Sequence, residues 1–150
     1  MASDGLLNGI AGRWSGTYQL WLGPGDPVSA SPSEATVTSE LGGKSALLRY
    51  SWSYEGAEHH GLALISRNDD NGLCEMGWSD TFHYPGAVMH CKSSSPEMNV
   101  TGSYVVDGTT WLWRTSVELP SPNELLITAW FVDQEDEETL ATEARYQRVV

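Results

Sequence analysis

Hydrophobic and polar side chains alternate with a period of two along almost the whole chain beyond residue 13. In the clearest segment, 46–55, large apolar side chains share one face, and small or charged ones share the other. The apolar face comprises Leu48, Tyr50, Trp52 and Tyr54, and the opposite face comprises Arg49, Ser51 and Ser53. This alternation is typical of a strand and does not fit a helix.

The same periodicity predicts ten strands, each ended by turn residues such as Gly42-Gly43 and Asp107-Gly108. The predicted strands cover residues 13–22, 34–41, 46–55, 58–66, 74–80, 88–92, 99–106, 110–119, 124–132 and 139–149. The turns between successive strands are short, which favours an antiparallel meander, and closure into an up-and-down barrel protects its edges. A sandwich with Greek-key crossings ranks second, because it needs longer connections.

The N-terminal segment 3–11 has helical spacing, with Leu6, Leu7 and Ile10 on one side and Gly12 as the stop. Ser3 or Asp4 is the expected N-cap. We expect this short helix to close one end of a barrel that covers 13–149. The 150 residues form a single domain in this interpretation.

Composition limits the partners. The chain has 8 basic and 20 acidic residues, a formal charge of −12, which disfavours binding to nucleic acid or to an anionic membrane surface. The N-terminus lacks a basic region followed by an apolar stretch, so we expect a cytoplasmic protein in which Cys74 and Cys91 are reduced thiols. The seven Trp, six Tyr and two Phe either fill a thick core or line a ligand pocket.

Four segments carry a resemblance to a known family. They are Gly12-Arg13-Trp14-Ser15-Gly16, the strand from Leu47 to Gly56, Trp78-Ser79-Asp80-Thr81-Phe82-His83, and Glu143-Ala144-Arg145-Tyr146. Together they resemble DUF1579, a family of bacterial proteins of unknown function. The opening Gly-x-Trp-x-Gly is also similar to that of the calycins, which include lipocalins, fatty-acid-binding proteins and nitrobindins. The resemblance implies a ten-stranded lipocalin-like barrel with a helix at one end, and Trp14 packed across that end.

The resemblance does not imply a cofactor. Nitrobindin-like proteins hold haem through a histidine near the C-terminus, and this chain has no histidine after His90. Fatty-acid-binding proteins hold a carboxylate with an Arg-x-Tyr pair, whereas Arg145 and Tyr146 are adjacent and should point to opposite faces. We therefore expect neither haem nor a fatty-acid clamp, and no cofactor of another kind.

The stretch from Gly77 to Gly86 carries the candidate chemistry. Asp80 and His83 are three residues apart across a predicted strand-to-loop bend at 83–86, so the carboxylate can meet the imidazole and hold one tautomer. The pair are candidate catalytic groups or ligand contacts. The plainer alternative is that Asp80 caps the turn through backbone amides and His83 fills a buried bend. The expected ligand-binding residues are Tyr50, Trp52, Trp78, Asp80, His83 and Trp113.

The remaining polar residues are weaker candidates. His59 and His60 must face opposite ways on a strand, and the pattern does not say which faces inward. The histidine and cysteine spacings match no metal-ligand motif, so no metal site is expected. Cys91 is a candidate nucleophile in an otherwise ordinary core strand. The charged residues that interrupt apolar strands are Arg49, expected outward, and Arg114 and Glu143, whose direction stays open.

Three functions fit these observations. The first is the binding of a small apolar or aromatic molecule inside the barrel. The second is an enzyme, a cyclase, isomerase or hydrolase that uses Asp80 and His83 for acid-base chemistry. The third is a structural or protein-interaction barrel whose interior is filled. A homodimer through an exposed strand face at Trp21 or Trp130 is compatible with each of them.

Overall fold

The computed structural model describes residues 3–150, and the predicted N-cap side chains of Ser3 and Asp4 lie outside the described part. The elements are α1 (Ser3–Gly9), β1 (Gly12–Leu20), β2 (Ser29–Glu40), a short 3₁₀ turn (Leu41–Gly43), β3 (Ser45–Tyr54), β4 (Ala57–Arg67), β5 (Cys74–Asp80), β6 (Tyr84–Lys92), β7 (Asn99–Val106), β8 (Thr109–Ser121), β9 (Glu124–Val132) and β10 (Glu138–Arg148). Every strand pairs antiparallel with its neighbours in sequence, and β1 pairs with β10, which closes the barrel. The predicted ten-stranded up-and-down barrel is confirmed.

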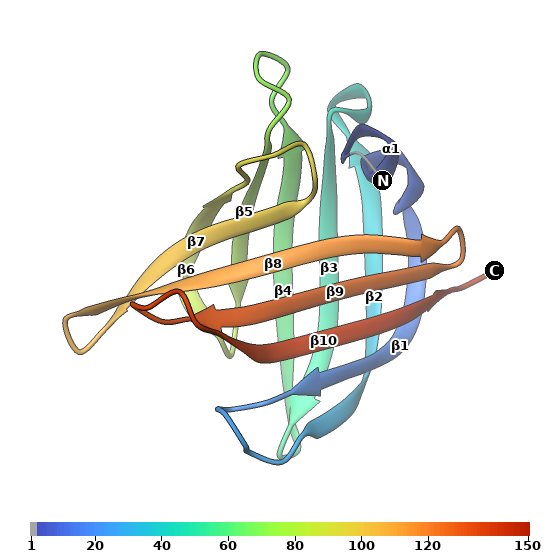
Figure 1. Cartoon of the computed structure of the whole chain (residues 1–150). Helices are drawn as coiled ribbons and strands as arrows, with labels where there is room; N and C mark the ends of the chain where they lie inside the picture. Colours follow the sequence, from blue (N-terminus) through green and yellow to red (C-terminus); the bar gives the residue numbers. More distant parts are fainter. Residues whose placement is uncertain (1–2) are drawn as a thin grey trace.

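The barrel is flattened, with β3 and β4 crossing the direction of β8 and β9 at a steep angle (Figure 1). One end of the barrel is covered by α1, which buries Leu6, Leu7 and Ile10 against the interior. Trp14 is also buried there and donates its indole N–H to the carbonyl of Ile10 at 2.9 Å. The side chain of Arg148 covers the Trp14 ring at 4.3 Å. Each such apolar side chain contributes about 1.5–3 kcal/mol when fully buried, so this end is a stable closure. In residues 3–150 there is no helix of the length and apolarity needed to cross a bilayer.

The opposite end of the barrel, called the mouth here, is formed by the turns 21–28, 55–56, 81–83, 107–108 and 133–137. The site described below lies at this end. Its β5–β6 connection, Thr81–His83, is the mouth turn.

Two strands begin earlier than the sequence predicts. β2 begins at Ser29 rather than at residue 34, and β6 begins at Tyr84 rather than at residue 88. The predicted bend at 83–86 was therefore wrong: the chain turns at 81–83, and Pro85 and Gly86 lie within β6. Proline removes a ladder donor, which a strand tolerates where it has no partner on that side.

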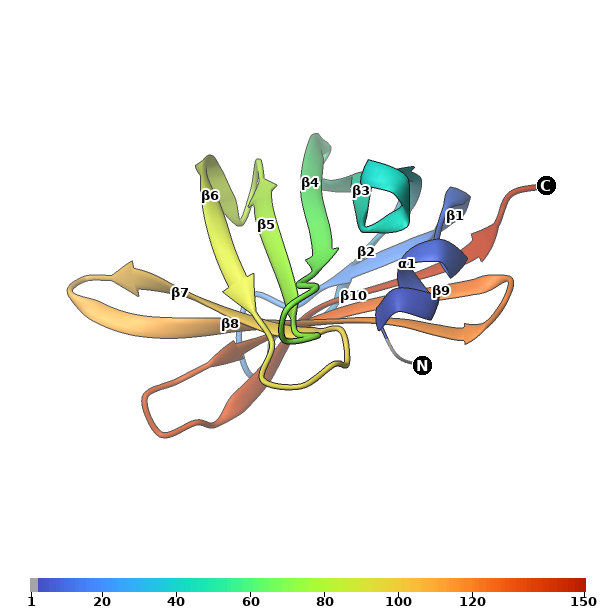
Figure 2. The same ribbon diagram turned by 90° about the horizontal axis from the view of Figure 1, so that it is seen from above.

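Pro85 has no register partner on β5, and β6 is hardly paired with β7. The only register partners between these two strands are Lys92 and Thr101, whereas β7 and β8 are paired along their whole length. Figure 2 shows β6 and β7 diverging from this point, with the β7–β8 hairpin projecting away from β6. Met89 fills the space between them near the interior, because a Cβ on Gly102 would lie 2.7 Å from its sulfur. Pro85 is thus accommodated by a local opening of the barrel wall.

Candidate functional site

Asp80 is the buried centre of the mouth. It ends β5 on the inward face and its side chain is 1% exposed. One carboxylate oxygen accepts the backbone N–H groups of Phe82 and His83 at 2.8 and 3.0 Å. A carboxylate that accepts amides two and three residues ahead is a local turn cap. Asp80 therefore fixes the mouth turn.

The second carboxylate oxygen of Asp80 ties the turn to β3. It accepts the Tyr50 hydroxyl at 2.7 Å and the Trp52 indole N–H at 3.2 Å. The Tyr50 oxygen accepts in turn the indole N–H of Trp78 at 2.9 Å. Charge-assisted hydrogen bonds in a buried network are short and strong, so this arrangement is rigid.

Gly61 makes room for that network. It is the register partner of Asp80 on β4, and a Cβ at this position would lie 1.9 Å from the Tyr50 ring carbon Cζ. No side chain fits between the Tyr50 ring and the β4 backbone. The hydroxyl of Tyr50 reaches Asp80 only because residue 61 is glycine.

The His83 side chain covers the interior at the mouth. Its ring stacks near Trp52 at 5.5 Å between centroids, and lies 5.1 Å from Trp113 and 6.1 Å from Trp78. Its Nε2 is hydrogen-bonded to the Tyr18 hydroxyl at 3.1 Å. Phe82 packs edge-on against both Trp52 and His83. The mouth turn thus places the imidazole of His83 among the aromatic side chains of Trp52, Trp78, Phe82 and Trp113.

Burial controls the charge of this imidazole. It lowers the pKa of His83 to about 4, although the nearby Asp80 carboxylate favours the charged form, and His59 lowers the pKa further. Burial raises the pKa of the Tyr18 hydroxyl as well. At neutral pH the hydrogen bond therefore joins a neutral imidazole to a protonated phenol.

A small cavity of about 40 Å³ lies in the barrel interior, deeper than the His83 ring. Aromatic rings form one part of its wall, from Tyr18, Tyr50, Trp78 and Trp113, and small side chains form the other. Ala129 is the register partner of both Thr115 on β8 and Thr142 on β10, so two hydroxyl side chains flank it. The volume accommodates at least one water molecule, but no organic ligand of ordinary size.

The sequence was compared with models of protein families. The model for proteins of unknown function named DUF1579 matches residues 3–148. The chain belongs to the DUF1579 family. No curated protein matches its sequence.

Among solved structures, this DUF1579 protein is similar to the S-type phycobiliprotein lyase CPES from Guillardia theta. The TM-score is 0.58 at 13% sequence identity, and the alignment covers 100% of this chain and 94% of the lyase. At this identity the likeness shows the barrel fold alone.

Most predicted ligand-binding residues of the DUF1579 chain meet at the mouth. The inward residues are Tyr50, Trp52, Trp78, Asp80 and Trp113, and all but Tyr50 are buried. The predicted contact between the Asp80 carboxylate and the His83 imidazole takes another form. The carboxylate accepts the backbone amide of His83, and the imidazole is bonded to Tyr18. Of the two local alternatives, the structure has the turn cap.

The structure also answers the questions of direction. His59 faces the mouth, 5.0 Å from the Trp52 ring, and His60 is exposed. Arg49 is exposed, as expected. Arg114 lies on the outer face, paired with Glu138 and stacked over Trp130 at 3.9 Å.

The last two candidates are Glu143 and Cys91. Glu143 lies on the outer face beside Arg145 at 3.4 Å. Burial raises the pKa of the Cys91 thiol to about 11, which disfavours the thiolate that a nucleophile needs. Within residues 3–150 no three His, Cys, Asp or Glu side chains gather closely enough to hold a metal ion.

Sequence reasoning missed Tyr18, Phe82, Thr115 and Thr142. Tyr18 was detectable, because it follows Trp14 and Gly16 on the inward face of β1. Thr115 and Thr142 could not be detected from the sequence, because threonine is common in strands and can face either side of a sheet. Their importance depends on the cavity that they line.

Proposed function

We propose that this DUF1579 protein binds one small, uncharged, apolar or aromatic molecule inside the barrel, beneath the mouth turn. Trp78 and Trp113 supply aromatic contact area, since their rings stack on each other, 5.2 Å apart between centroids, and both line the cavity. His83 supplies a neutral polar contact at the top of the site. Asp80, Tyr50 and Trp52 form the framework, because their polar groups are already bonded to one another.

The observation that carries this proposal is the Thr115 side chain. It lines the cavity, is only 7% exposed, and its hydroxyl has no hydrogen-bond partner among the described residues. Buried polar groups in proteins are nearly always bonded, so a buried hydroxyl that has no protein partner and belongs to a cavity-lining residue indicates a missing partner. A water molecule or a polar group of a ligand fills that role.

Ligand binding requires the mouth turn to move. A cavity of about 40 Å³ is far below the roughly 300 Å³ of ordinary ligand sites. The turn is held by two backbone hydrogen bonds to Asp80 and by ring contacts of Phe82 and His83. The movement that we propose is an outward rotation of these two side chains, which pack against the cavity-lining residues Tyr18, Trp78 and Trp113 or their neighbour Trp52; it breaks no strand pair. The barrel wall stays intact while the ligand enters.

The electrostatics favour binding over proton transfer. A general base works best with a pKa near the operating pH, and His83 has a pKa of about 4. Asp80 accepts four hydrogen bonds from its own protein, which leaves it poorly placed to exchange a proton with a substrate. Acid-base catalysis by this pair is the weaker candidate.

Titration with N-phenyl-1-naphthylamine, a neutral fluorescent probe, tests the proposal. We expect the probe to bind in the barrel and to accept energy from the surrounding tryptophans. Ala129→Val fills the cavity between Thr115 and Thr142 and should weaken binding at least about tenfold, while the melting temperature stays equal or rises. Ala57→Val adds the same atoms at an exposed position of β4 and is the control. Equal binding by the two variants would refute an interior site.

A further inference from the structure

A second concave site lies at the mouth, separated from the interior cavity by the aromatic side chains of the mouth. It is bounded by the β1–β2 loop, the β7–β8 hairpin and the β9–β10 turn, and its volume is about 420 Å³. We call it the outer groove and define it by Leu22, Tyr104, Trp111, Phe131, Asp133 and Glu137. This volume falls in the usual range of small-molecule sites, roughly 300–1,000 Å³. The outer groove is large enough for a ligand without any rearrangement.

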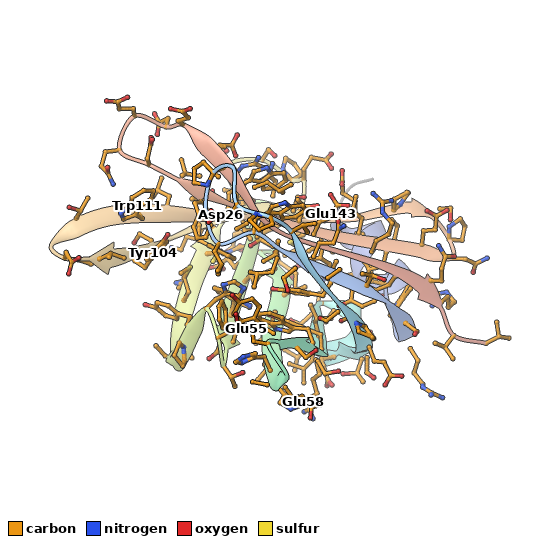
Figure 3. The ribbon with its side chains drawn as sticks, turned by 90° about the horizontal axis from the view of Figure 1, so that it is seen from below. Asp26, Glu55, Glu58, Tyr104, Trp111 and Glu143 are labelled. Carbon is orange, nitrogen blue, oxygen red and sulfur yellow. The ribbon has the colours of Figure 1, made fainter. Side chains whose placement is uncertain are left out.

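One wall of the outer groove is aromatic. Tyr104 and Trp111 are register partners on β7 and β8, so their side chains are neighbours on one face of the hairpin. Figure 3 shows both on this hairpin, in a view onto the mouth from below. Phe131 completes the wall and packs edge-on against Trp113 at 5.4 Å. The Phe131–Trp113 contact separates the outer groove from the interior cavity, because Phe131 lines the groove and Trp113 lines the cavity.

The other side of the outer groove is acidic. Asp133 holds the β9–β10 turn by accepting the backbone N–H groups of Glu135 and Glu137, each at 2.9 Å. The Gln134 side chain donates to the carbonyl of Thr110 at 2.7 Å, which fixes this turn beside Trp111. The turn is thereby held next to the aromatic wall, and the Asp133 and Glu137 side chains line the groove there.

These carboxylates are not neutralised within the described structure. No lining residue of the outer groove is basic, and the Glu137 carboxylate has no ion pair or hydrogen bond with any described residue. The nearby cation of β8, Arg114, points to the outer face and is engaged by Glu138, Asn99 and Trp130. The combination of aromatic faces and uncompensated carboxylates attracts cations.

We propose that the outer groove is a binding site for small amphiphilic cations. The ammonium or guanidinium group lies between Glu137 and the face of Trp111, and the apolar body packs against Phe131 and Leu22. The net charge of −12 draws such ligands toward the protein and repels carboxylates and phosphates. This site is independent of the interior site proposed above, because the two have different lining residues.

Calorimetric titration with three ligands of one shape tests the charge preference. The probes are 4-phenylbutylammonium, 4-phenylbutanol and 4-phenylbutyrate, which share an apolar body and differ in charge. We expect the cation to bind about tenfold more tightly than the alcohol, and the anion not to bind. Equal affinities for the cation and the alcohol would overturn the proposal.

Matched charge variants locate the cation. Glu137→Gln should weaken cation binding about fivefold and leave alcohol binding unchanged. Glu135→Gln removes the same charge from the same turn but lies outside the groove lining, so it should change cation binding less than twofold. An equal loss in both variants would mean that the cation responds only to net charge, which contradicts a site at Glu137.

A second pair of variants separates the two sites. Trp111→Ala, with its fold checked by circular dichroism, should weaken cation binding and preserve the binding of N-phenyl-1-naphthylamine. Ala129→Val should have the opposite effect, since it changes only the interior cavity. Loss of cation binding in Ala129→Val with full binding in Trp111→Ala would place the cation inside the barrel and refute the outer groove as its site.

Discussion

Acidification should destabilise the fold through His83. The imidazole has an ordinary pKa of 6.5 when unfolded and a pKa of about 4 when folded, because burial disfavours its charged form. Between these two pH values His83 is protonated in the unfolded chain and neutral in the folded chain. Stability from this group is therefore complete above pH 6.5 and falls as the pH falls toward 4.

The magnitude follows from the two pKa values. The full interval from 6.5 to about 4 corresponds to about 3 kcal/mol, and the part lost between a pH of about 7.5 and about 5 is about 2 kcal/mol. Urea unfolding at these two pH values measures it, because the midpoint shift converts to a free energy of unfolding.

His83→Gln isolates this contribution from that of the carboxylates. The variant keeps a polar side chain but cannot titrate, so its loss of stability over the same interval should be smaller than that of the wild type by about 2 kcal/mol. His60→Gln is the matched control, since His60 is exposed at the rim. Equal losses in the wild type and His83→Gln, or an NMR titration that places the His83 pKa near 6.5, would refute this reasoning.

Three further perturbations test the framework of the site. Asp80→Asn replaces one of the two carboxylate oxygens, each of which accepts two hydrogen bonds, with a donor, and should lower the free energy of unfolding by about 3 kcal/mol in urea titrations. Gly61→Ala places a Cβ 1.9 Å from the Tyr50 ring and should cost at least about 2 kcal/mol in the same assay, whereas Gly77→Ala meets only an ordinary contact at 3.7 Å and should cost much less. Equal costs for the two glycines would contradict the close approach of Tyr50. Cys91 should resist thiol reagents at mildly alkaline pH until the protein unfolds, because burial raises its pKa to about 11, and rapid labelling of the native protein would show that this strand opens.

Much of the barrel could be predicted from alternation alone. A period of two defines an inward and an outward face, which correctly placed Tyr50, Trp52 and Trp78 inside and Arg49 outside. The mouth turn could not be placed this way. Pro85-Gly86 is an ordinary turn signal, and it lies within β6 at a place where neither β5 nor β7 supplies a register partner.

The partners of the site also depend on the folded sheet. Asp80 meets Tyr50 and Trp52, which lie 30 and 28 residues earlier, because β3, β4 and β5 are adjacent in the barrel. Sequence spacing indicates only neighbours along the chain, such as His83. The local reasoning therefore included the turn cap that Asp80 makes, as one of its two alternatives, but not the bonds of the carboxylate to Tyr50 and Trp52.

The central claim is that a neutral ligand enters the cavity beneath the mouth turn. A crystal structure of the protein soaked with N-phenyl-1-naphthylamine tests it most directly. We predict density that contacts the rings of Trp78 and Trp113 and extends from Thr115 toward His83, with Phe82 and His83 moved outward to admit the ligand. Density confined to the outer surface, with His83 still bonded to Tyr18 and the cavity unchanged, would contradict the claim.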